Sequence, residues 1–520
     1  MRPIGPRRSM LKIENLSLYH RKDLTPIVTG LTFTLRDHER LALIGEEGNG
    51  KSTLLRCIAG DDGVQEYVEV TGRVITDRRP GYLPQELPES ERALSAYEFF
   101  CESDAFFDQT PKELGELCAQ LSLPGDVFYS EQRMADFSGG ERVKLQLARL
   151  MLGKPDLLLL DEPSNDLDGD TVLWLEDFLC HCEANVIFVS HDEQLLSRAA
   201  TGVLLLERLR HRQLPRATLM RVGYDDFVRT RADAFAHQEQ VARKEREEYR
   251  EKMRKYEQIR ARVEHEQNAI SRGNPAGGRL LKKKMHAVMA TGRRFEREKE
   301  NMTAMPEAEE AIFAKLSCAP LPPTKTVLDL DLPELTIEDR ILARNLRLIV
   351  RGREKVAIVG RNGAGKSTLL RRIADMLSGR QDIRLFVMPQ DPGALLTAGK
   401  TPVELLQITG DGEENARIRT ELGSLQFTAE EMAHPCDGLS GGQKAKLMFL
   451  MMARSGANVV LLDEPTRNLS PLSGPVIRRL LSDFEGCVIA VSHDRLFLSE
   501  VCTRAVRLNE SGLIPEEDGN

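Results

Sequence analysis

Residues 41–53 read LALIGEEGNGKST and residues 356–368 read VAIVGRNGAGKST, and these two stretches decide the fold. Each joins a short apolar run, typical of a buried β-strand, to a glycine-rich loop that ends in Gly-Lys-Ser-Thr. The glycines of such a loop let backbone N–H groups turn inward around phosphate groups, and the following helix points its positive end at the anion. One match is weak, whereas two in one chain indicate two phosphate-binding domains.

The second half of the chain repeats the first. Apolar runs end in Asp-Glu-Pro at 161–163 and at 463–465, and VIFVSHD at 186–192 corresponds to VIAVSHD at 488–494. FSGGE at 137–141 corresponds to LSGGQ at 439–443. All three pairs are separated by the same 302 residues. Such a fixed spacing identifies an internal repeat of one domain.

This set of motifs, with a glutamine in LPQ (Gln85) and in MPQ (Gln390), resembles the ATP-binding cassette superfamily over nearly the whole chain. The resemblance implies an α/β fold with two tandem ATP-binding cassette (P-loop NTPase) domains. It also implies that the cassettes pair head to tail, so that each ATP lies between the P-loop of one and the Ser-Gly-Gly signature of the other. The expected activity is ATP hydrolysis, with ATP and Mg²⁺ as the cofactors.

The resemblance assigns roles residue by residue. Ser52 and Ser367, with Asp161 and Asp463, are expected to hold Mg²⁺. Glu162 and Glu464 are expected to polarise the attacking water, and His191 and His493 to contact the γ-phosphate. The expected ATP-binding residues are Gly45, Gly48, Gly50, Lys51, Ser52, Thr53, Gln85, Ser138, Gly139, Gly140, Gly360, Gly363, Gly365, Lys366, Ser367, Thr368, Gln390, Ser440, Gly441 and Gly442. Tyr19 is expected to stack on adenine in the first half, while the second half has no aromatic residue between 327 and 345.

The two halves differ where charge matters. The first P-loop carries Glu46 and Glu47 where the second carries Arg361 and Asn362. Like charge beside a polyphosphate predicts a weaker or slower first site, unless the acids turn outward. After the second Asp-Glu-Pro, Ser470 stands where the first half has an aspartate, so the contact made by this loop is expected to differ.

Between the halves lies a charged segment with no counterpart in either. Apolar residues recur in it at a seven-residue step, first at Val228, Phe235, Ala242, Tyr249, Tyr256, Val263 and Ile270, and then at Leu281, Val288, Phe295 and Met302. This step is the seam of a helix that lies against a partner helix, and SRGNPAGG at 271–278 is a turn signal. The pattern predicts a long antiparallel α-helical hairpin, a coiled coil, as the linker. The predicted domains are 1–223 for the first cassette, 224–326 for the linker and 327–520 for the second cassette.

The linker is basic in an acidic chain. Residues 241–299 hold 18 Lys and Arg against 9 Glu, whereas the whole chain has a net charge of −8. From 270 to 294 the basic residues are Arg272, Arg279, Lys282, Lys283, Lys284, Arg293 and Arg294, and no acid intervenes. A solvated coiled coil is one explanation of such charge. A tip of one sign suits the phosphates of a nucleic acid.

Two cassettes, a long charged hairpin and no apolar run of the ~18 residues that a membrane helix needs resemble the ABC-F subfamily. The resemblance implies a ribosome-binding ATPase that contacts rRNA and tRNA near the tRNA exit site, with the linker directed toward the peptidyl-transferase centre. The spacing from Gln85 to Ser138 leaves no room for an extra arm, and the chain ends at Asn520, soon after the second cassette. These features favour the branch that confers antibiotic resistance by ribosomal protection, with a housekeeping translation factor as the alternative.

Other functions compete less well. A transporter subunit with separate membrane chains gives no reason for a basic hairpin, and a regulatory ATPase that binds DNA or free RNA through the tip also fits the charge. Nine cysteines in no paired pattern indicate no disulfide framework, and a cytoplasmic monomer with intramolecular cassette pairing is expected.

Overall fold

The computed structural model describes residues 11–165, 167–208, 214–269, 275–300, 302–303, 321–337, 340–396, 399–425, 427–467 and 469–516. The chain forms two compact units. One takes in Met1–Tyr224 together with Glu309–Asn520, and the other is Asp225–Ala308. The first unit holds both halves of the internal repeat, and the second holds the helical linker.

The first cassette is built on a six-stranded sheet of order β5-β6-β7-β3-β8-β9. Its strands are β5 (Pro80–Leu83), β6 (Leu157–Asp161), β7 (Asn185–Val189), β3 (Arg40–Gly45), β8 (Gly202–Arg208) and β9 (Leu214–Met220), all parallel to their neighbours except β9. The apolar run at 157–160 is fully buried because a parallel sheet is covered on both faces. A three-stranded antiparallel sheet of β1 (Leu11–His20), β2 (Pro26–Thr34) and β4 (Val68–Thr76) completes its core.

The second cassette repeats this order as β13-β14-β15-β12-β16-β17. Its strands are β13 (Leu385–Met388), β14 (Val459–Asp463), β15 (Cys487–Val491), β12 (Lys355–Val359), β16 (Arg504–Asn509) and β17 (Gly512–Pro515). The hairpin of β10 (Thr326–Ile337) and β11 (Arg340–Arg351) packs on the same core. The predicted fold class of two tandem α/β cassettes is confirmed.

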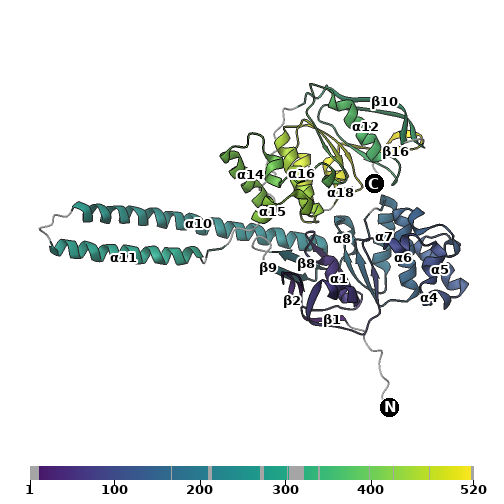
Figure 1. Cartoon of the computed structure of the whole chain (residues 1–520), viewed down its shortest axis with the longest axis horizontal. Helices are drawn as coiled ribbons and strands as arrows, with labels where there is room; N and C mark the ends of the chain where they lie inside the picture. The colour runs from purple at the N-terminus through teal and green to yellow at the C-terminus, as the bar shows by residue number, and fades with distance from the viewer. Residues whose placement is uncertain are drawn as a thin grey trace, which may run out of the picture. The chain divides into compact units, whose positions relative to one another are not determined.

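Helices surround each sheet (Figure 1). In the first cassette they are α1 (Lys51–Ala59), α2 (Glu89–Arg92), α3 (Ala96–Cys101), α4 (Asp104–Phe107), α5 (Pro111–Leu121), α6 (Gly139–Leu152), α7 (Gly169–His181) and α8 (Glu193–Ala199). In the second they are α12 (Lys366–Ser378), α13 (Pro402–Leu406), α14 (Gly412–Ser424), α15 (Ala429–Ala433), α16 (Gly441–Ser455), α17 (Gly474–Ser482) and α18 (Arg495–Val501). A capping box starts α3, α5, α6, α13, α15 and α16, which explains why these helices begin where they do.

The linker is a pair of long helices, α10 (Tyr224–Ala269) and α11 (Pro275–Glu300), which run side by side in Figure 1. Contacts join Glu245 to Thr303 (2.7 Å), Lys252 to Glu298 (3.1 Å) and the ring of Tyr256 to that of Phe295 (5.9 Å between centroids). Residue numbers increase along α10 while those of their contact partners decrease, so the two helices are antiparallel. Ala242, Val263, Leu281 and Phe295, all on the predicted seven-residue step, are buried. Ile270 lies outside the described residues.

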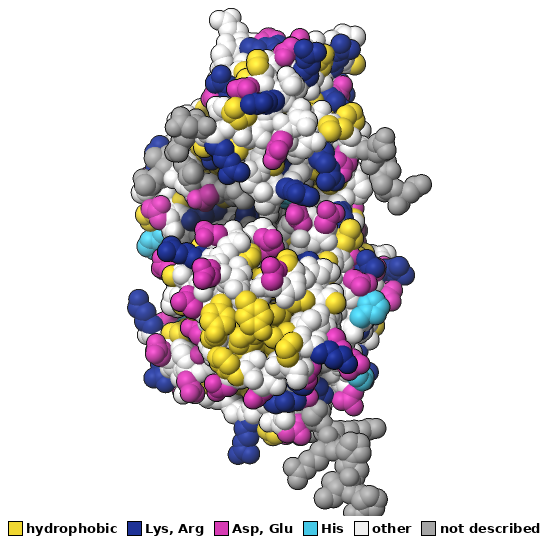
Figure 2. All heavy atoms as spheres, turned by 90° about the vertical axis from the view of Figure 1, so that its right-hand side faces the viewer, with side chains coloured by type: hydrophobic (Ala, Val, Ile, Leu, Met, Phe, Trp, Pro, Cys, Tyr) yellow, Lys and Arg dark blue, Asp and Glu magenta, His cyan; other side chains and the backbone are white. Residues whose placement is uncertain are grey.

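Two surfaces of the chain contrast in character. Figure 2 shows apolar side chains gathered on the face that lies to the right in Figure 1, and the exposed large aromatic residues of the first cassette's helical part are Tyr97, Phe107 and Tyr129. The acids Asp104 and Asp108 lie close to Phe107 in the sequence. The exposed surface of α11, in contrast, is basic. Among the described residues no helix is long and apolar enough to cross a membrane.

Candidate ATP-binding and hydrolysis sites

The first P-loop connects β3 to α1 at the carboxyl edge of the sheet. Gly48 and Gly50 have φ of 79° and 84°, the left-handed region that favours glycine. A Cβ at Gly50 would also lie 2.1 Å from Ile27. The ammonium of Lys51 is buried and donates to the carbonyl oxygens of Gly45 (2.9 Å) and Glu46 (3.0 Å). Lys51 therefore lies inside the loop, where it can reach phosphate oxygens.

The second P-loop, between β12 and α12, has the same geometry despite its different sequence. Gly363 and Gly365 have φ of 79° and 94°. Lys366 donates to the carbonyl oxygens of Gly360 (2.8 Å) and Arg361 (3.0 Å). Burial lowers the pKa of Lys366, and the nearby Glu464 and Asp463 oppose that shift. Both loops thus place a buried lysine beside buried carboxylates.

The residues predicted to hold Mg²⁺ come together in both cassettes. Asp161, at the end of β6, accepts from the hydroxyl of Tyr82 at 3.3 Å, and burial raises its pKa while the nearby Ser52 opposes the rise. Asp463, at the end of β14, also has a pKa that burial raises and that the nearby Ser367 opposes. Within the described residues the Oδ1 atom of each aspartate is buried and has no hydrogen-bond partner. A buried carboxylate oxygen without a donor is costly, and a serine hydroxyl beside it completes an oxygen donor set that suits Mg²⁺.

Glu162 lies at the centre of a hydrogen-bonded cluster. It accepts from the side-chain amides of Gln85 (3.0 Å) and Asn165 (2.5 Å), and its other oxygen lies 3.1 Å from Nε2 of His191. Burial raises the pKa of Glu162, but the hydrogen bond and charge of His191, together with Lys51, outweigh burial and leave the pKa below its ordinary value. Asn165 was not predicted as a site residue. Its position three residues after Glu162, in the turn that follows the strand, is the feature of the sequence that could have predicted this contact.

Glu464, the equivalent residue in the second cassette, is held more loosely. The N–H of His493 donates to it at 3.4 Å, and Nε2 of His493 lies 3.7 Å away with no hydrogen-bond partner in the described part of the chain. Burial raises the pKa of Glu464 to about 7. Burial, with Lys366, lowers the pKa of His493 to about 4. Gln390 is exposed and makes no hydrogen bond to Glu464 among the described residues. The surroundings of the two glutamates are therefore unequal.

Both glutamates share an unusual backbone. Glu162 has φ of 49° and Glu464 has φ of 51°, in the left-handed region that residues with a side chain rarely adopt. Their N–H groups donate to Val189 (3.1 Å) and Val491 (2.9 Å) on the neighbouring strands. Strain of this kind at equivalent positions is typical of functional residues that the surrounding fold holds in place.

The signature motifs begin α6 and α16. The hydroxyl of Ser138 accepts from the N–H of Glu141, and the hydroxyl of Ser440 accepts from the N–H of Gln443, each at 3.3 Å. A Cβ at Gly140 would lie 2.8 Å from Oγ1 of Thr171, so only glycine fits there. The two glycines of each motif therefore leave backbone amides at the start of a helix, where an anion binds well.

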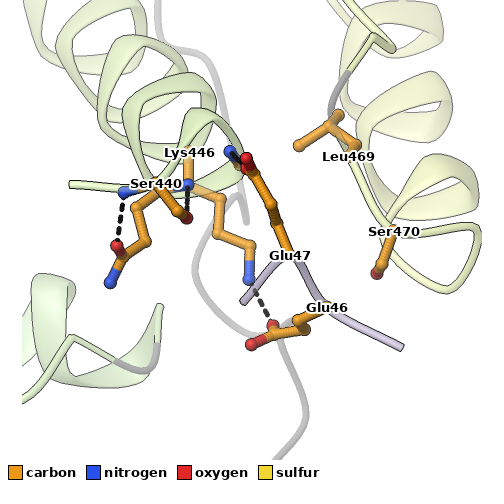
Figure 3. Close-up of a pocket in the computed structure, with 8 residues that line it drawn as sticks. Glu46, Glu47, Ser440, Lys446, Leu469 and Ser470 are labelled. Atoms are coloured by element: carbon orange, nitrogen blue, oxygen red, sulfur yellow. Dashed lines mark hydrogen bonds and ion pairs between the residues drawn. The ribbon is translucent and has the colours of Figure 1, made fainter. Parts of the chain in front are cut away.

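The first P-loop and the second signature are in contact, as head-to-tail pairing requires (Figure 3). Oε2 of Glu47 accepts from the N–H of Gly442 at 2.5 Å, and Oε1 of Glu46 lies 2.7 Å from Nζ of Lys446. The acids of the first P-loop therefore point across to the second cassette and not outward. The weaker or slower first site that the sequence predicts stays a prediction.

The loops after the two Asp-Glu-Pro motifs also cross between cassettes. Nδ1 of His191 lies 2.6 Å from the carbonyl oxygen of Leu469, and Ser470 lines the pocket beside Glu46. At the other site, burial raises the pKa of Asp168. The hydrogen bonds from Thr171 and the nearby His493 and Arg361 outweigh burial, so the pKa lies below its ordinary value. The loop of the second cassette thus places Ser470 beside the first P-loop. The loop of the first cassette places Asp168 near Arg361 of the second P-loop.

The remaining predicted residues belong to β1, to the helices that follow the P-loops and to the hairpin. Tyr19 is half-buried in β1, paired with Pro26 of β2, and Thr53 and Thr368 lie in the first turn of their helices. Arg272 lies outside the described residues, whereas Arg279, Lys282, Lys283 and Lys284 are exposed on α11. Nζ of Lys284 lies 3.9 Å from Glu266 of α10, so the hairpin brings an acid to the tip that is free of acids in sequence.

Comparison with known proteins places these sites in a family. The family model described as ABC transporter matches residues 28–165 and 343–467, and the chain belongs to this family of ATP-binding cassette proteins. The Energy-dependent translational throttle protein EttA of Escherichia coli (strain K12) is 28% identical over 545 residues, which cover 95% of this chain and 91% of that protein. ATP-binding cassette sub-family F member 3 of Homo sapiens is 27% identical over 541 residues, with 95% and 70% covered. The chain is therefore an ATP-binding cassette ATPase with two cassettes.

The solved structures agree on the fold. The archaeal ribosome recycling factor aABCE1, in its complex with the archaeal ribosomal stalk protein aP1, matches with a TM-score of 0.58 at 17% identity and covers 97% of this chain and 91% of that chain. The RNase-L Inhibitor matches with a TM-score of 0.56. At this identity the likeness concerns the arrangement of two cassettes alone.

Proposed function

We propose that this ATPase binds the ribosome near the tRNA exit site and acts, through its helical hairpin, on translation at the peptidyl-transferase region. The observation that carries the proposal is the hairpin itself. Residues 275–294 of α11 contain six basic residues and no acid, and Arg279, Lys282 and Lys283 are exposed there. Such a surface suits RNA phosphates. The relative named as a translational throttle protein supports the same reading.

The described contacts support the proposed roles of particular residues in the chemistry. Mg²⁺, where bound, neutralises charge on the transferring phosphates. Ser52 and Asp161 would hold it in the first cassette, and Ser367 and Asp463 in the second. Glu162 and Glu464 accept the proton of the attacking water, since they lie beside the metal position on a fixed backbone.

The other polar groups bind and orient. Lys51 and Lys366 exchange their carbonyl acceptors for phosphate oxygens, and the glycine amides of the P-loops and signatures complete the cradle. His191 orients Glu162 and is the proposed contact of the γ-phosphate. Tyr19 supplies the stacking surface for adenine at the first site.

The proposal favours a translation factor over ribosomal protection against an antibiotic. The relatives reported above support ribosome-associated sub-family F proteins and give no support to resistance. Protection stays a separate prediction, which a drug-susceptibility panel on cells with and without the protein checks.

Co-sedimentation tests the proposed function directly. The chain is expected to pellet with ribosomes in the presence of a non-hydrolysable ATP analogue and to release them with ADP. Duplex DNA added in excess should not compete, because the proposed target is ribosomal RNA and tRNA. Equal binding to DNA, or none to ribosomes, would reject the proposal in favour of the DNA-binding or transporter alternatives.

A further inference from the structure

The acids of the first P-loop occupy an anion position on the second cassette. The N–H of Gly442 opens the 15-residue helix α16, and the carboxylate of Glu47 accepts from it at 2.5 Å. Lys446, one turn further along α16, pairs with Glu46 at 2.7 Å, and its side chain is 7% exposed. Amides at a helix start together with a lysine would suit a phosphate group. Here two carboxylates of the chain itself lie there (Figure 3).

The surrounding charges differ between the two cassettes in the same sense. The residue at the third helical position after the signature serine is Glu141 in the first cassette and Gln443 in the second, 302 residues apart. Likewise Asp168 of the first cassette corresponds to Ser470 of the second. The second cassette therefore has neutral side chains, Gln443 and Ser470, in the pocket beside Glu46 and Glu47, where acids would repel the P-loop. The first cassette has acids at both equivalent positions.

The same division of charge continues along the contact between the cassettes. Arg478 of α17 binds Glu193 of α8 through two hydrogen bonds, at 2.6 and 3.2 Å, and Arg495 of α18 pairs with Glu176 of α7. These are equivalent positions, because 176 corresponds to 478 and 193 to 495 in the 302-residue repeat. The first cassette has the acid at both positions and the second has the arginine at both.

We propose that the first cassette carries the acidic half and the second the basic half of a seam that pairs them without nucleotide. At the first site, Glu47 takes the place on the second signature that the γ-phosphate of ATP would take. ATP-dependent closing is then confined to the second site, where Arg361 and Asn362 supply no such carboxylate. This inference concerns the pairing of the cassettes and does not depend on ribosome binding.

Two physical arguments favour the seam. Hydrogen bonds to a charged group are stronger than neutral ones, and the partners here are largely shielded from water. Pairing of two first cassettes would set Glu176 against Glu193, and pairing of two second cassettes would set Arg478 against Arg495. The seam thus also selects the other half of the same chain as the partner.

Hydrogen–deuterium exchange on the full chain tests the proposal. Without nucleotide, amides at 440–446 are expected to exchange about tenfold more slowly than their equivalents at 138–144, because Glu47 holds one of them. Adding a non-hydrolysable ATP analogue should slow exchange at 138–144 and change 440–446 little. Equal exchange of the two peptides without nucleotide would overturn the proposal.

The sequence of the second P-loop provides a substitution that tests the role of Glu46 and Glu47. The double substitution Glu46→Arg and Glu47→Asn gives the first P-loop the residues of the second, and it should speed exchange at 440–446 until the analogue is added. The matched control, Glu66→Arg with Glu131→Asn, makes the same change of charge at exposed acids that form no ion pair within the described part of the chain. Unchanged exchange at 157–161 in both variants would show that each folds. Slow exchange that persists in Glu46→Arg/Glu47→Asn would also overturn the proposal.

Discussion

Glu193 of α8 and Arg478 of α17 form a bidentate ion pair between the two cassettes, with side chains 13% and 4% exposed. Arg478 also binds Glu500 at 2.7 Å within its own cassette. The arginine is thus held from both sides, and its pKa is raised by these carboxylates although burial opposes the shift. Removal of Arg478 would leave the carboxylate of Glu193 without this partner, and removal of Glu193 would leave the buried arginine with Glu500 alone.

The first prediction is therefore a positive coupling between these residues. Glu193→Gln and Arg478→Gln are each expected to destabilise the folded chain, and the double variant should cost about 1–3 kcal/mol less than the sum of the two. Trp174, the single tryptophan, lies in α7 and reports local unfolding by fluorescence during urea titration. Strict additivity would show that the pair contributes nothing.

The sequence predicted the parts of the molecule whose periodicity or local spacing determines them. The seven-residue step identified Ala242 and Phe295 as buried seam residues, and the Asp-Glu-Pro strands proved fully buried. The bond between Glu47 and Gly442 joins residues 395 positions apart, so it depends on how the folded cassettes pair. The opposite charges of Glu176 and Arg478 at equivalent positions can be read from the sequence repeat. That each of them faces the other cassette depends on the folded structure.

The second prediction concerns the water-polarising carboxylates. Glu162→Gln with Glu464→Gln should leave ATP binding intact and stop turnover, because the amides keep the shape of the side chains but cannot accept a proton. Phosphate release and nucleotide binding, measured on the same preparation, check both halves. Hydrolysis at the normal rate would remove these glutamates from the mechanism.

The third prediction is that the two sites contribute unequally. Glu464→Gln alone should reduce hydrolysis more than Glu162→Gln alone, because Glu46 and Glu47 compete with phosphate at the first site. Steady-state ATPase rates of the two single variants decide this. Equal losses would argue that both sites turn over alike or are strongly coupled.

The fourth prediction follows from the pKa of Glu464, which burial raises to about 7. A base must be ionised to accept a proton, so hydrolysis at the second site should rise as the pH increases through about 7. Glu162 has a pKa below its ordinary value, so the first site should be flat over the same range. The pH profiles of kcat/KM for Glu162→Gln, which retains the second site, and for Glu464→Gln, which retains the first, test this contrast. Superimposable profiles would contradict it.

The last prediction concerns the basic surface of α11. Changing Lys282, Lys283 and Lys284 to alanine should weaken ribosome binding and flatten its dependence on salt, since each lost phosphate contact removes about 0.7–0.9 from the slope of log affinity against log salt. Lys284 lies 3.9 Å from Glu266, so it should contribute less than the other two. ATPase activity without ribosomes should be nearly unchanged, because these residues are not part of either ATP site.

A matched variant separates the tip from the general charge of the hairpin. Lys244, Arg250 and Lys255 are exposed on α10, far in sequence from the turn, and their change to alanine removes the same three charges. Ribosome affinity measured by sedimentation over a range of salt should fall much less for this control than for the tip variant. If the two triple variants lose affinity equally, long-range attraction and not contact at the tip governs binding. An unchanged affinity and salt slope in the tip variant would instead identify the basic face of α11 as a solvated surface.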